Sequence, residues 1–135
     1  MYAYTAPAGL LKDDDQVDFS EKILDEDGQY LPGINDDFCY WRKLNSLHGW
    51  MEQLYYAKGG KSDSFNGDVV RLKEADIEAL ETAIEDKTLV RCQGFFFGDS
   101  EGEVTDDEYG EITAFCEKAR LAFELELAVI YSSCW

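Results

Sequence analysis

The stretch from Asp36 to Tyr56 constrains the fold most, because it combines the densest aromatic content of the chain with its only histidine. Apolar residues recur in it at helical spacing, which predicts one amphipathic helix. Asn35 and the two aspartates after it stand where an N-cap and first-turn acids belong, and two glycines follow where a helix ends. The predicted inward face consists of Tyr40, Leu44, Leu47, Met51 and Leu54.

A second stripe on the same predicted helix is half polar, which is unusual beside a face that enters the core. It contains Trp41, Asn45, His48, Glu52 and Tyr55. His48 is a candidate general base, oriented by Glu52 one turn later. The alternative is a partly buried histidine that is hydrogen-bonded within its own helix face, and we favour it because no nucleophile, metal set or phosphate loop lies nearby. The candidate pocket is Trp41, Asn45, His48 and Glu52.

The rest of the chain carries alternating strand and helix patterns over 135 residues, the length of one domain. Strands are predicted at 1–6, 69–72, 89–97 and 127–131, and helices at 74–86 and about 105–124. The last helix opens with a capping box of Thr105 and Glu108. Residues 12–37 carry turn signals that indicate at most a ragged hairpin. We therefore expect a single α+β domain, 1–135, in which three helices pack on one face of a small mixed sheet that holds both terminal strands.

The net charge of −17 is large for this length. It repels nucleic acids and anionic membranes, and it attracts basic surfaces. The sequence has no apolar run near the roughly 18–20 residues that span a bilayer and no signal-peptide pattern, so we expect a cytoplasmic protein. The cysteines lack zinc or disulfide spacing, so we expect reduced thiols and neither metal nor cofactor. They are Cys39, Cys92, Cys116 and Cys134.

Carboxylates gather in three segments, of which the first is residues 13–37. In the second, four glutamates share one face of a predicted helix with no lysine between them, and the third is an acidic block without a basic residue. A solvated face with favourable first-turn acids explains part of this pattern. Convergence of the three segments would instead make a negative surface in place of nucleic-acid phosphates. The candidate partner-binding residues are Glu74, Glu78, Glu81, Glu85, Asp99, Glu101, Glu103, Asp106 and Asp107.

Three motifs together point to a family. They are Tyr40-Trp41-Arg42-Lys43 followed by Asn45, His48 and Trp50; the Gly-Phe-Phe-Phe-Gly run from Gly94 to Gly98; and Tyr131-Ser132-Ser133 with Trp135. Over roughly residues 38 to 135 the chain resembles a group of small proteins common in bacteriophages and prophages, which have no settled enzymatic activity. The resemblance implies a phage origin and gives no catalytic residues. The acidic segment from Asp99 to Glu108 departs from the group, where tyrosine is more frequent.

Small acidic phage proteins often inhibit host defence or transcription machinery, an analogy at the level of class. The leading hypothesis is a non-enzymatic inhibitor of a basic host protein or nucleoprotein complex, such as a CRISPR effector or a restriction complex. A small hydrolase or ligand-binding protein is the first alternative, with a pocket around Trp41, Asn45, His48 and the turn at 94–98. A structural or housekeeping phage protein is the second. We also expect Trp41, His48 and residues 95–97 to meet in one cluster.

Overall fold

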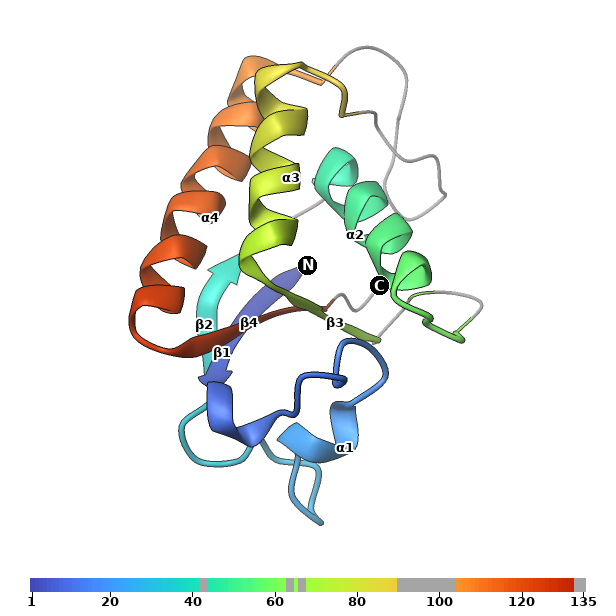
Figure 1. The fold of residues 1–135 in the computed structure, drawn as a ribbon, viewed down its shortest axis with the longest axis vertical. Helices are drawn as coiled ribbons and strands as arrows, with labels where there is room; N and C mark the ends of the chain where they lie inside the picture. The colour runs from blue at the N-terminus through green and yellow to red at the C-terminus, as the bar shows by residue number, and fades with distance from the viewer. Residues whose placement is uncertain (42–43, 63–64, 66–67, 90–103, 133–135) are drawn as a thin grey trace.

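The computed structural model describes residues 1–41, 44–62, 65, 68–89 and 104–132, and Figure 1 shows how they are arranged. Four strands form one sheet in the order β2-β1-β4-β3. All three pairings between neighbouring strands are antiparallel, so the prediction of a mixed sheet is wrong. A parallel pair needs a crossover that returns the chain to the same end of the sheet, and no neighbouring strands here are joined in that way. The strands are β1 (Tyr2–Pro7), β2 (Asn35–Tyr40), β3 (Val69–Leu72) and β4 (Leu127–Ser132).

Three helices cover one face of this sheet, as predicted: α2 (Asn45–Ala57), α3 (Glu74–Glu85) and α4 (Asp106–Glu124). The opposite face is covered by residues 8–34, which include a short 3-10 helix, η1 (Ala8–Leu10), and one turn of α-helix, α1 (Ser20–Ile23). The ragged hairpin predicted within residues 12–37 is reduced to one antiparallel bridge, between Leu24 and Tyr30. The packing of this segment on the sheet was not predicted, because its apolar residues have neither helical nor strand periodicity. None of the described helices is long and apolar enough to cross a membrane.

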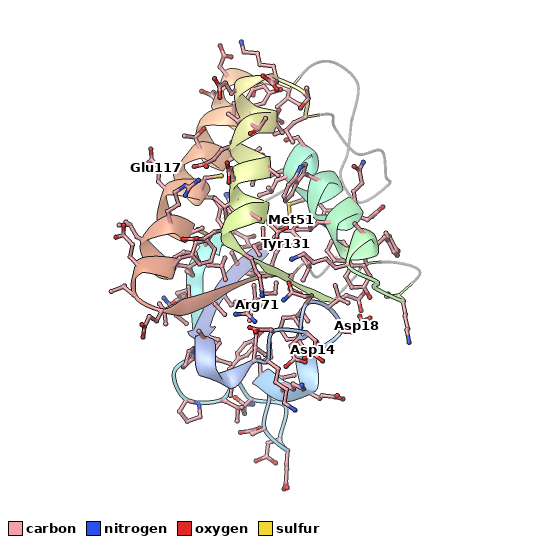
Figure 2. The ribbon with its side chains drawn as sticks, in the orientation of Figure 1. Asp14, Asp18, Met51, Arg71, Glu117 and Tyr131 are labelled. Carbon is pink, nitrogen blue, oxygen red and sulfur yellow. The ribbon has the colours of Figure 1, made fainter. Side chains whose placement is uncertain are left out.

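The two layers explain why β4 is apolar at almost every position. Val129 and Tyr131 face the helices, whereas Ala128 and Ile130 pack against residues 8–34. Side chains of a strand alternate between the two faces of its sheet, so a strand that is buried on both faces loses the apolar and polar alternation. In Figure 2, Met51 of α2 and Tyr131 of β4 lie in the layer between the helices and the sheet.

The predicted helix from residue 36 begins too early, because Asn35–Tyr40 form β2 and α2 starts only at Asn45. Tyr40 lies opposite Tyr2 of β1 and is 62% exposed, so it does not belong to the inward helical face. The buried face of α2 is also rotated toward the half-polar stripe, since His48 and Tyr55 are fully buried beside Leu47 and Met51.

The other predictions made from local patterns hold where the structure describes the residues. Strands β1, β3 and β4 and helices α3 and α4 lie within a residue or two of their expected bounds. The capping box is present, because the Thr105 N–H donates to Glu108 Oε2 at 2.8 Å and the Glu108 N–H donates to Thr105 Oγ1 at 3.2 Å. The predicted strand at 89–97 lies outside the described residues except for Leu89, which is buried and belongs to no strand.

Candidate functional site

His48, a residue of α2, lies in the core against β4. Its imidazole is fully buried, and Nδ1 lies 2.8 Å from the Tyr131 hydroxyl oxygen. The ring of Phe65 lies 5.2 Å from the imidazole, centroid to centroid. Burial lowers the pKa of His48 to about 4, and the nearby N-terminal ammonium adds to this, so the ring is neutral at neutral pH. The prediction placed the partner of this histidine within its own helix, whereas the structure gives it a partner from β4, Tyr131.

The candidate pocket is divided by the fold. Trp41 is buried, with its ring edge-on to Phe115 at 5.1 Å and 6.4 Å from the ring of Tyr131, so Trp41 and His48 share Tyr131 as a neighbour. Glu52 lines a separate cavity that neither of them lines. Asn45 is the first residue of α2, and its side chain lies outside the described part, as do residues 95–97 of the predicted cluster.

Three of the cavities that described residues line are large enough to consider as binding sites, and they differ in volume and charge. The largest, about 720 Å³, lies between the start of α3 and the end of α4, and its charged lining residues are Arg71, Lys73, Glu74 and Glu126. A second, of about 350 Å³, lies between α2 and the end of α3 and contains Glu52. A third, of about 400 Å³, follows β2 beside α4; its charged lining residues are Asp37, Glu111 and Lys118.

The glutamate stripe on α3 is only partly a free acidic face. Glu74, Glu78 and Glu85 are exposed as expected. Glu81 is instead paired with Arg120 of α4, whose Nε donates to Glu81 Oε2 at 2.9 Å and whose second nitrogen bonds the other oxygen. Arg120 lowers the pKa of Glu81, and Glu81 raises the pKa of Arg120, with smaller contributions from Glu74 and Glu78. The sequence places no lysine between the four glutamates, and the cation that relieves Glu81 comes from the neighbouring helix α4.

Helices α3 and α4 run antiparallel side by side, so the end of α3 lies beside the start of α4 (Figure 1). Glu85 and Asp86 close α3, and Asp106 and Asp107 open α4; all four are exposed. We call these four residues the acidic end. Lys87, exposed next to Asp86, is the cation closest to them in sequence.

The three acidic segments do not converge on one side. Most of the first segment, residues 13–34, belongs to the layer on the opposite face of the sheet from α3 and α4, and Asp14 lies there in Figure 2. Residues 35–37 belong to β2 instead, and Asp18 accepts a hydrogen bond from the Tyr55 hydroxyl of α2. Asp99, Glu101 and Glu103 lie outside the described residues. The acidic surface that can be assigned is therefore the acidic end, together with the exposed glutamates along α3.

Lys58, directly after the end of α2, is a central polar residue of the fold that the sequence analysis did not single out. Its ammonium donates to Gln16 Oε1 at 2.9 Å, to the Arg71 carbonyl at 2.5 Å and to Asp76 Oδ2 at 2.6 Å. It therefore joins α2, β3 and α3 to the segment before α1. Burial lowers the pKa of Lys58, while the bond to Asp76 opposes that shift. No local pattern could have revealed this role, because all three partners are distant in sequence.

Within the described part of the chain, no group of histidine, cysteine and carboxylate side chains is placed to hold a metal ion. Cys116 is buried and Cys39 half-buried, and both are free thiols; Cys92 and Cys134 lie outside the described residues. Burial raises the pKa of Cys116 to about 12, so this thiol is a packing group rather than a nucleophile at neutral pH.

Searches of protein-family models, curated proteins and solved structures give no match to this chain, so the resemblance to phage proteins stays a prediction.

Proposed function

We propose that this chain is a non-catalytic binding protein that occupies a basic, nucleic-acid-binding surface of a partner through its acidic end. The observation that carries the proposal is the meeting of exposed carboxylates from two separate segments, 85–86 and 106–107, at one end of the α3 and α4 pair. A defence complex of the bacterial host is the partner class that the sequence resemblance favours.

The competing hydrolase hypothesis is weaker because its central residue is enclosed. A general base must reach the proton that it removes, directly or through one water. His48 is fully buried against Tyr131 and Phe65, and its candidate companion Glu52 lines another cavity. These positions favour a structural role for the imidazole and leave binding as the better-supported activity.

The density of charge argues for a local contact rather than an imitation of a whole duplex. From Glu74 to Glu85 the axis of α3 advances by about 16 Å at about 1.5 Å per residue, over which a duplex carries roughly ten phosphate charges. Only Glu74, Glu78 and Glu85 are exposed acids on that stripe, because Glu81 is paired with Arg120. We therefore expect electrostatic steering to a small basic patch, with the body of the domain blocking the nucleic acid.

The test begins by capturing partners from a bacterial lysate at low and at high salt on the immobilised chain. For each captured nucleic-acid-binding protein, displacement of a fluorescent duplex is then followed by anisotropy. We expect displacement at low salt that weakens steeply as salt rises. At about 5 Å from a partner cation in water, one charge contributes about 0.8 kcal/mol, and reversal doubles the change, so Glu85→Lys should weaken binding roughly fifteen-fold.

Glu26→Lys is the matched control, because it changes the net charge equally at an exposed position in the layer on the other face of the sheet. We expect this variant to weaken partner binding by less than about threefold, since exposed charges more than a Debye length away are screened. Equal losses for both variants would mean that only net charge matters, which contradicts a defined acidic end. If neither variant changes binding, the acidic residues serve solubility and not recognition of the partner.

A further inference from the structure

The cavity between α2 and α3 has an unusual combination of lining groups. Its volume is about 350 Å³, and Glu52 is the only charged residue among those that line it. Gly49 contributes no side chain, which leaves room beside the indole of Trp50. The lining residues are Ser46, Gly49, Trp50, Glu52, Gln53, Ala83, Thr88 and Leu89.

Ser46 adds an unfilled polar position to the lining of this cavity. The residue is fully buried, and its hydroxyl oxygen has no hydrogen-bond partner in the structure. A buried hydroxyl without a partner costs free energy, which a ligand donor recovers when it reaches the oxygen. Since Ser46 is covered, a ligand must displace part of the cavity wall to contact it.

The remaining groups select the chemistry of that ligand. The Glu52 carboxylate attracts a cation, and no described cation lines the cavity to compete for it. The half-buried Trp50 lines the cavity with an indole, the aromatic group over which cations stack best, and guanidinium groups do so more often than ammonium groups. A guanidinium also carries several N–H donors in one plane, enough for both a carboxylate and a hydroxyl.

We propose that this cavity receives an arginine side chain of the partner protein. This inference rests on the proposed function and specifies one partner residue that the chain would bind. The position agrees with that function, because Ala83 and Thr88 flank the Glu85 and Asp86 carboxylates of the acidic end in sequence. The largest cavity is less suited to a cation, since Arg71 and Lys73 line it.

The test uses the isolated protein and two small probes, N-acetyl-arginine amide and its neutral analogue N-acetyl-citrulline amide. Binding is followed by ¹H–¹⁵N NMR at the Gly49 amide and the Trp50 indole N–H. We expect a weak, saturable shift of both signals with the arginine probe and none with the citrulline probe. Glu52→Gln should weaken this binding by about tenfold, as the charge is removed from the pair. Ser46→Ala should weaken it by roughly threefold, as one hydrogen bond is lost.

Glu117→Gln is the control, because it removes one charge from the exposed surface of α4 (Figure 2) and should leave the shifts unchanged. Equal shifts from both probes, or binding indifferent to Glu52→Gln, would overturn the arginine site. If Glu85→Lys still impairs partner binding while the probe results fail, the cavity inference alone is wrong. If the arginine probe binds as described but no basic partner is captured, the proposed function alone fails.

Discussion

Because His48 is buried, we predict that the stability of the folded protein falls as the pH falls below the ordinary pKa of histidine. The imidazole has an ordinary pKa of 6.5 in the unfolded chain and a pKa of about 4 in the folded protein. Between these values the unfolded state binds a proton that the folded state refuses, so stability falls as the pH falls through that window. The loss reaches about 2 kcal/mol at about pH 5 relative to about pH 7.5, and about 3 kcal/mol once the pH is below both pKa values.

Urea unfolding followed by circular dichroism at about pH 7.5 and about pH 5 measures this loss. Carboxylates also titrate as the pH falls, so the comparison needs a variant that lacks only the imidazole. His48→Asn serves, because the asparagine amide can still hydrogen-bond the Tyr131 hydroxyl at the position of Nδ1. We expect the native chain to lose about 2 kcal/mol more than His48→Asn between the two pH values. An equal loss in both proteins would mean that the imidazole is protonated as easily in the fold as in water, which would refute its burial in the core.

Two further stability predictions follow from close contacts. Gly60→Ala would place a Cβ in collision with the Tyr55 ring, so it should lower the free energy of unfolding by about 1–3 kcal/mol. Gly110→Ala lies inside α4, where the new Cβ meets nothing within 4 Å, and it should stabilise the protein by about 0.5–1 kcal/mol. An equal loss of stability at both sites in urea unfolding would contradict the packing of Tyr55. Lys58→Met should lower the free energy of unfolding by roughly 3 kcal/mol in the same assay, because it leaves the Asp76 carboxylate largely buried without its cation. A loss below about 1 kcal/mol would mean that water replaces the ammonium.

Sequence patterns predicted the elements whose signals are local. The capping box of α4 lies within four residues, and the apolar spacing of α3 repeats within each turn, so neither depends on distant partners. β4 was also predictable, since a short apolar run is typical of a strand that is buried on both faces.

The errors occurred where distant partners decide the structure. Residues 35–40 have acids that imitate a helix start, but pairing with β1 satisfies their backbone as a strand. The ion pair of Glu81 joins residues 39 positions apart, and the hydrogen bond of His48 spans 83 positions. Spacing along one helix cannot reveal either partner, so it could not show that Glu52 lines a cavity that neither Trp41 nor His48 lines.

The order of strands has a consequence for the time course of synthesis. β1 lies between β2 and β4, and its pairing with β4 joins Tyr2 to Ser132 and Pro7 to Leu127. When the chain leaves the ribosome, β1 and β2 are complete early, whereas β4 follows only after more than eighty further residues, roughly 4–17 s later at about 5–20 residues per second. During that interval one edge of β1 has no partner strand and its apolar faces lack most of their cover. The pairing of β1 with β4 is therefore a long-range closure at the centre of the sheet, and pairings of this kind form slowly and leave strand edges exposed in the meantime.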